Sequence, residues 1–111
     1  MVCVTEFVQV TTAAGSREAA FVLARSAVGA RLAAGAQVVG PVGSVFWHLG
    51  ELGEGEEWAV VLKTTTDRFP GLRDHLVANH PWTNPEVTAT AVVDGTPEYF
   101  EWLRRTVAPD A

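Results

Sequence analysis

The sequence predicts an α+β domain in which helices cover one face of an antiparallel sheet, and three observations carry this prediction. The length of 111 residues fits one domain, because the common domain size is roughly 100–150 residues. Hydrophobic residues make up 48% of the chain and charged residues 19%, which suffices for a packed core. β-forming runs alternate with segments of helical periodicity, an order that favours helices on one side of a sheet.

The first two predicted elements are a strand over residues 2–12 and a helix over residues 16–34. The strand carries β-forming residues at both parities, which is typical of a strand buried on both faces. Ser16 suits the N-cap of the helix, whose apolar residues recur at i, i+3 and i+4. Gly35 fits the left-handed residue that ends a helix, so we expect the helix to reach Ala34.

Two further strands are predicted over residues 36–49 and 56–66. A Gly- and Glu-rich connection at residues 50–55 joins them into a hairpin. Gly40-Pro41 interrupts the first of the two, and proline inside a strand is tolerated mainly at edges or bulges.

A second helix follows, with Thr66 or Asp67 as its cap and Pro70 in its first turn. His80-Pro81 stops this helix, because the residue before a proline disfavours helical geometry. Its inner face is predicted to carry Leu72, Leu76 and Val77.

The last predicted elements are a strand over residues 86–93 and a helix that Thr96 caps, with Pro97 at its first position. The apolar face of that helix comprises Tyr99, Phe100, Leu103 and Val107. The full order is βαββαβ plus a terminal helix, which is the ferredoxin-like arrangement in one domain over residues 1–111.

The central hairpin is too long for the domain that carries it. A run of ~14 residues spans roughly 46 Å, whereas a chain of this length folds to a globule roughly 35 Å across. The far end therefore overhangs, and each large apolar side chain there gains roughly 1.5–3 kcal/mol on burial. We expect self-association to bury it, unless Gly40-Pro41 and Gly43 break the run into two short strands that fold back. The expected interface residues are Phe46, Trp47, His48, Leu49 and Trp58.

Five segments, in order along nearly the whole chain, carry a family resemblance. They are Val8-Gln9-Val10-Thr11-Thr12-Ala13, Arg31-Leu32-Ala33-Ala34, Leu62-Lys63-Thr64-Thr65, His80-Pro81-Trp82-Thr83-Asn84-Pro85-Glu86 and Tyr99-Phe100-Glu101-Trp102-Leu103. In these segments the sequence resembles the CutA family of divalent-cation-tolerance proteins. The resemblance implies a ferredoxin-like homotrimer with the hairpin at the subunit contacts. It also implies a link to metal-ion tolerance, with copper or other divalent ions as ligands.

No preassembled metal site is visible, because no two histidines are spaced at i, i+4 and no cysteine pair accompanies them. His80, supplemented by Glu86 or by another subunit, is the candidate ligand for a weakly held copper or zinc ion. His80 has a structural alternative, since an imidazole at a helix C-terminus can bond free carbonyls. We expect His75 on the solvent side of its helix and Cys3 as a small buried hydrophobe.

Composition and charge argue against several classes of function. Eight basic and thirteen acidic residues give a net charge of −5 and no basic stripe, so we expect neither nucleic-acid nor membrane binding. Glu6 and Gln9 interrupt any signal-peptide core, which favours a cytoplasmic location. The chain has no nucleophile elbow or phosphate loop, so we expect no enzyme and no required cofactor.

The expected function is that of a non-catalytic trimer connected with divalent-metal homeostasis. The alternative is a PII-like small-ligand or signalling trimer with clefts between subunits, lined by Lys63, Trp82 and Trp47. Lys63 lies on an apolar strand, so it pairs with a carboxylate or points into such a cleft. A third alternative is an interaction module that presents its hairpins to a protein partner.

Overall fold

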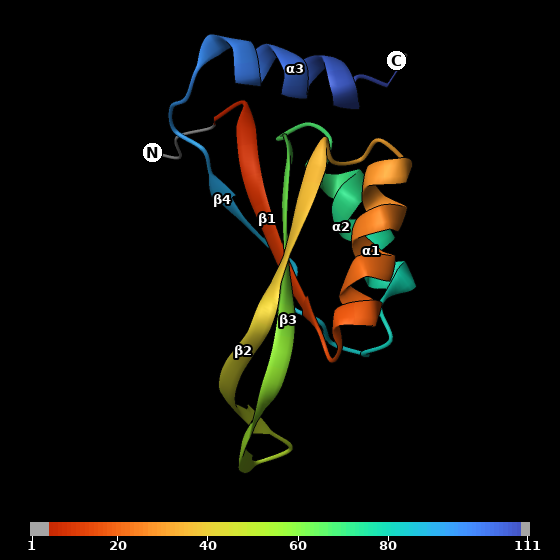
Figure 1. Cartoon of the computed structure of the whole chain (residues 1–111), viewed down its shortest axis with the longest axis vertical. Coiled ribbons are helices and arrows are strands. Elements are labelled where there is room, and N and C mark those ends of the chain that lie inside the picture. Colours follow the sequence, from red (N-terminus) through yellow and green to blue (C-terminus); the bar gives the residue numbers. More distant parts are fainter. Residues whose placement is uncertain (1–4, 110–111) are drawn as a thin grey trace.

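The computed structural model describes residues 5–109, which form a four-stranded antiparallel sheet and three helices (Figure 1). Helices α1 and α2 lie on one face of the sheet, and α3 crosses one end of it. The strand order β2-β3-β1-β4 confirms the ferredoxin-like arrangement. The elements are β1 Phe7–Ala14, α1 Arg17–Gly29, β2 Gly35–His48, β3 Glu51–Thr65, α2 Phe69–Asn79, β4 Thr88–Ala91 and α3 Pro97–Val107. None of these helices is long and apolar enough to cross a membrane.

The first strand lies later in the chain than predicted. It begins at Phe7 and runs to Ala14, whereas the expectation for Cys3 lies outside the described residues. Every second residue of β1 from Val8 to Ala14 points toward α1 and α2. Phe7 lies on the other parity and packs against α3. The ring of Phe100 stacks on Phe7 with centroids 4.2 Å apart, which fixes α3 at this end of the sheet.

Helix α1 begins as predicted and ends earlier. Ser16 is the N-cap, and its hydroxyl accepts a hydrogen bond from a main-chain N–H of the first turn at 3.1 Å. The predicted end at Ala34 is wrong, because the helix stops at Gly29 and Arg31 adopts the left-handed conformation with φ 58°. Gly35, expected to end the helix, instead begins β2.

The hairpin of β2 and β3 stays paired to its tip, so the predicted connection over residues 50–55 is wrong. The turn consists of Leu49 and Gly50 alone, both with positive φ, and His48 pairs with Glu51. The glycine-rich run belongs to β3, where Gly53 pairs with Phe46 and Gly55 with Ser44. Position 53 requires glycine because a Cβ there would lie 2.8 Å from the ring of Phe46.

The predicted interruption at Gly40-Pro41 is confirmed as a register shift between Val39 and Val42. The strands stay paired on both sides of it, so the hairpin does not fold back. Figure 1 shows the paired strands extending beyond the body of the molecule. The longest extent of the whole molecule is 44 Å. The end carries exposed apolar side chains at Val45, Phe46, Trp47, Leu49 and Leu52.

Helix α2 begins without the predicted side-chain cap. Arg68 is its N-cap and forms no side-chain capping bond, while the hydroxyl of Thr66 donates to the carbonyl of Thr5 instead. The helix ends at Asn79 with His80 as its C-cap, which confirms the predicted stop at His80-Pro81. Val77, expected on the inner face, is exposed.

The last two elements are shorter or more exposed than expected. Strand β4 covers only Thr88–Ala91, because it is an edge strand that pairs with four residues of β1. Thr96 and Pro97 begin α3 as predicted, and Leu103 and Val107 are buried. Tyr99, expected on the apolar face, is 43% exposed.

Candidate functional site

Two of the sequence-predicted site residues, His80 and Trp82, lie together in the segment after α2. Their rings are 4.9 Å apart, and Trp82 is partly exposed. Trp47 lies near the hairpin tip, which Figure 1 places at the opposite end of the molecule from α3, and Lys63 lies within the body on β3. Lys63, Trp82 and Trp47, the residues proposed to line one cleft, are therefore far apart within a single chain. Only contact between copies of the chain could bring them together.

His80 joins the segment after α2 to the end of β1. Its Nε2 lies 2.7 Å from the carbonyl oxygen of Ala13, and its Nδ1 accepts a hydrogen bond from the main-chain N–H of Trp82 at 3.0 Å. Nδ1 is therefore the acceptor, and Nε2 carries the proton and donates to Ala13. Both nitrogens of this buried ring are engaged, so the geometry fits the structural role more closely than that of a ligand.

The other potential metal ligands do not surround His80. Glu86 is exposed and accepts a hydrogen bond from the hydroxyl of Thr88 at 2.8 Å. Within residues 5–109, no three His, Cys, Asp or Glu side chains lie close enough together to hold a metal ion. Because stable zinc and copper sites use three or four donors, one chain does not supply a complete site from these residues.

Lys63 lies half-buried in a small hollow of about 260 Å³ between β2, β3 and the start of α3. None of the ion pairs formed within residues 5–109 includes it. Of the two sequence expectations for this lysine, pairing with a carboxylate is therefore not met inside the described chain. The hollow is lined by Gly35, Ala36, Gln37, Val61, Lys63 and Tyr99.

His75 is not on the solvent side of α2, as the sequence suggested, but half-buried against α1. Its Nε2 lies 2.7 Å from the hydroxyl oxygen of Ser26. The two residues are 49 positions apart, so no local spacing could have indicated this bond. The pair ties the two helices together on the covered face of the sheet.

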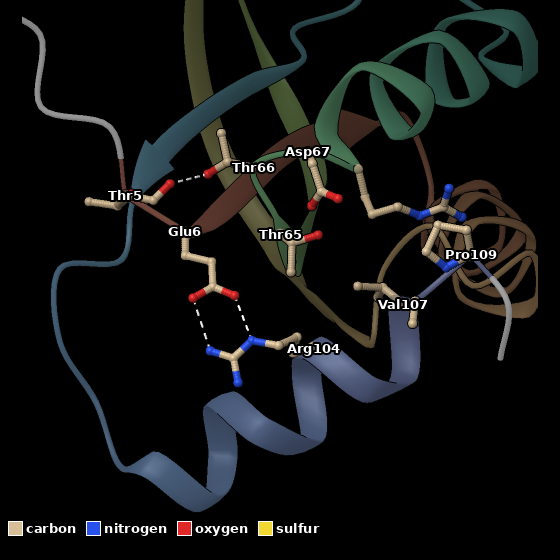
Figure 2. A pocket seen from close by; sticks show the side chains of 10 residues that line it. Thr5, Glu6, Thr65, Thr66, Asp67, Arg104, Val107 and Pro109 are labelled. Atoms are coloured by element: carbon tan, nitrogen blue, oxygen red, sulfur yellow. Dashed lines mark hydrogen bonds and ion pairs between the residues drawn. The ribbon is translucent and has the colours of Figure 1, made fainter.

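A larger pocket, of about 710 Å³, lies at the α3 end of the molecule, and sequence reasoning missed it (Figure 2). Three separate segments form it: the residues before β1, the turn between β3 and α2, and the end of α3. Apart from Thr65, none of the lining residues lies in a segment that carries the family resemblance, so only the folded chain reveals the pocket. Its lining residues are Thr5, Glu6, Thr65, Thr66, Asp67, Arg68, Arg104, Val107, Ala108 and Pro109.

One wall of this pocket is a bidentate ion pair between Glu6 and Arg104 (Figure 2). The carboxylate oxygens lie 2.6 Å from Nε and 2.9 Å from Nη2 of the guanidinium. These hydrogen bonds hold the pKa of the Glu6 carboxyl below its ordinary value of 4.5 and raise the pKa of Arg104. The guanidinium also lies over the ring of Phe7, at 5.3 Å from its centroid.

The lowered pKa of Glu6 predicts a pH-dependent contribution to stability. Because the folded-state pKa lies below the unfolded one, the stabilisation is present above about pH 4.5 and is lost as pH falls through the folded-state pKa. Urea unfolding of the Glu6→Gln variant should therefore show a stability deficit at neutral pH that shrinks in acid. The deficit is small and salt-sensitive, because both side chains are about half exposed.

Arg104→Gln provides the control for this ion pair. The double variant should lose no more stability than Arg104→Gln alone, since both substitutions remove the same ion pair, whereas Arg104→Gln also removes the contact of the guanidinium with the ring of Phe7. If the stability deficit of Glu6→Gln stayed constant as the pH was lowered below the folded-state pKa of Glu6, this would contradict the assigned link between the pKa of Glu6 and stability.

The family of the chain follows from its sequence. Residues 8–106 match the family model described as CutA1 divalent ion tolerance protein. The chain belongs to the CutA1 family. A relative, the divalent-cation tolerance protein CutA of Thermus thermophilus, is 39% identical over 89 residues, covering 80% of this chain and 86% of that protein. Protein CutA 1, chloroplastic, of Oryza sativa is 33% identical over 91 residues, which are 82% of this chain and 51% of that protein.

Solved CutA1 structures share the fold. That of the Thermus thermophilus protein matches with a TM-score of 0.88 at 35% identity, over 92% of this chain and 99% of that one. That of Oryza sativa matches with a TM-score of 0.90 at 29% identity, over 96% and 97% of the two chains. The family resemblance and the ferredoxin-like fold predicted from the sequence are thus confirmed.

Proposed function

We propose that this CutA1 chain works as a non-catalytic homotrimer in divalent-cation tolerance, with copper as the representative ion. The observation that carries the assembly is the hairpin end. There Trp47 is 74% exposed and Leu49 is 90% exposed, on strands that project beyond the body of the molecule (Figure 1). A monomer would leave these side chains in water, and burying each is worth roughly 1.5–3 kcal/mol.

The open face of the sheet also supports self-association. Both α1 and α2 lie on one side (Figure 1), and on the opposite side α3 packs only at one end, where Phe100 stacks on Phe7. A sheet face of this kind is normally buried against another layer. Sheets of neighbouring copies can supply that layer, and closed symmetry lets each hairpin reach an adjacent subunit. The threefold number comes from the family resemblance.

The proposed contact with metal ions is weak and lies between subunits. His80 would have to give up its bond to the carbonyl of Ala13 to coordinate an ion, whereas Glu86 is exposed and accessible. Donors from a neighbouring copy would complete the coordination, because the described residues of one chain hold no cluster of three potential ligands. This arrangement suits transient contact with copper or zinc better than a permanent structural site.

The cytoplasmic location stays a prediction. The printed names of relatives point to several compartments: a solved Archaeoglobus fulgidus structure is titled periplasmic, and the rice protein is named chloroplastic.

A PII-like ligand-binding trimer is the second candidate, and Lys63 favours it. This half-buried ammonium has no ion-pair partner within residues 5–109 and lies in a hollow on the open sheet side beside Tyr99. Lysine is rarely fully buried without a partner, so if a neighbouring copy covers Lys63, an anionic ligand between subunits would provide that partner. In this alternative Trp47 and Trp82 of neighbouring copies complete the cleft.

Calorimetric titration tests both candidates on the trimer. Copper and zinc should bind weakly to the wild type, and Glu86→Gln should weaken that binding further. Isotherms of His80→Ala that match the wild type would reject His80 as a ligand. ATP serves as the anionic probe, and binding of ATP that Lys63→Gln abolishes, with no heat from either metal, would favour the PII-like candidate instead.

A further inference from the structure

The pocket at the α3 end holds two buried polar groups with no partner within the described chain. Thr65 is only 4% exposed, and its hydroxyl forms no hydrogen bond. The Nε of Arg68, in the same lining, is also buried and unpartnered. Buried polar groups are almost always hydrogen-bonded, so two such groups lining one pocket indicate a missing acceptor.

The two groups are held in place by the fold. Thr65 is the last residue of β3, paired with Phe7 of β1, and Figure 2 shows its side chain directed into the pocket beside Asp67. The guanidinium of Arg68 is oriented by a long hydrogen bond of 3.4 Å from its Nη2 to the carbonyl of Arg31. Arg68 is also the N-cap of α2, where the helix dipole adds partial positive charge. An oxyanion is the acceptor that suits this corner.

The remaining charges of the pocket restrict the ligand further. Glu6 and Arg104 neutralise each other, as described above. Asp67 is exposed at the rim, and none of the ion pairs within residues 5–109 includes it. One unpaired cationic side chain, Arg68, and one unpaired anionic side chain therefore face the same space. A simple anion would be repelled by Asp67, whereas a molecule with both a carboxylate and an ammonium group matches both charges.

The third part of the pocket is apolar. Val107, Ala108 and Pro109, at the end of α3, line this part. The volume of about 710 Å³ is far larger than an isolated oxyanion needs. The pocket thus offers room for an aliphatic group attached to the charged head.

We propose that this pocket binds a free α-amino acid with an aliphatic side chain. The carboxylate accepts hydrogen bonds from the hydroxyl of Thr65 and from Nε–H of Arg68 once these two side chains turn toward the pocket, because both atoms are shielded from solvent in the unliganded chain. The ammonium group pairs with Asp67, and the aliphatic group packs on the apolar wall formed by the end of α3. This site uses neither the hairpin nor Lys63, so it is independent of the function proposed above.

Titration of the full chain with L-leucine, followed by calorimetry, tests the proposal. We expect saturable binding at millimolar concentrations or below. Thr65→Val keeps the shape of the side chain and removes the hydroxyl, so it should weaken binding by about tenfold or more. Thr12→Val is the matched control, because Thr12 also has a buried hydroxyl without a partner but lies outside the lining of this pocket. It should leave binding unchanged.

Two analogues separate the charged contacts. Isocaproate lacks the ammonium group of leucine and 3-methylbutylamine lacks the carboxylate, and each should bind at least about tenfold more weakly. Asp67→Asn should reduce leucine binding to the level of isocaproate. The proposal is overturned if leucine does not bind at millimolar concentrations, if Thr65→Val binds it like the wild type, or if isocaproate binds as tightly as leucine.

Discussion

Replacing Trp47 and Leu49 together with serine should convert the assembly to monomers at micromolar concentration. Both side chains project from the overhanging end of the hairpin, where the body of their own chain does not cover them. Their burial in a neighbouring subunit is worth roughly 3–6 kcal/mol per chain for the two, which is about two to four powers of ten in the association constant. Light scattering on eluting protein should change from three times the 11.9 kDa chain mass to one.

A control of the same chemistry distinguishes the hairpin from general surface apolarity. Val93→Ser replaces a side chain that is 85% exposed but lies near α3, away from the hairpin. It should leave the trimer intact. A wild type that elutes as a monomer would contradict the proposed assembly, and a serine variant that remains trimeric would remove the hairpin end from the interface.

The overhang could be predicted from the sequence because it depends on strand length alone. Two β-forming runs joined by a short connection exceed the width of a domain of this size, whatever the details of their pairing. The turn could not be predicted correctly, because Gly53 and Gly55 suggest a loop. At Gly53 the actual reason is tertiary: the ring of Phe46 on the opposite strand fills the space where a side chain at this position would lie.

The end of α1 was missed for a similar reason. The apolar pattern continues through Leu32, Ala33 and Ala34 and therefore predicts a helix that includes them. These residues pack into the core from a non-helical connection that Arg31 begins with a positive φ. Hydrophobic periodicity reports burial, and burial alone does not distinguish a helix from a turn that covers the same core.

Local sequence patterns predict where some residues of the candidate sites lie, but not which distant residues they contact. His80 could be placed at the end of α2 because a proline follows it, but its partner Ala13 lies 67 positions away in sequence. The pocket at the α3 end combines Glu6 with Arg104, which are 98 positions apart. Such pairs arise because the sheet order places β1 between β3 and β4, next to segments that are distant in sequence. A search for local motifs does not find them.

Removing the imidazole of His80 should cost more stability than removing that of any other histidine. His80→Ala leaves the carbonyl of Ala13 and the main-chain N–H of Trp82 without their partners in a part-buried region, a loss of about 2–4 kcal/mol in the free energy of unfolding. His75→Ala is the matched control: it removes one bond to a half-buried hydroxyl and should cost about 1 kcal/mol.

Urea unfolding at one fixed subunit concentration measures both variants, because the stability of an oligomer depends on concentration. If His80 instead served mainly as a ligand, its removal would relieve the cost of burying a polar ring without losing a structural contact. The metal-free His80→Ala variant would then unfold at the same urea concentration as His75→Ala or higher. A clear deficit for His80→Ala in the absence of metal therefore assigns this histidine to the joint between β1 and α2, since no ion is present to account for it.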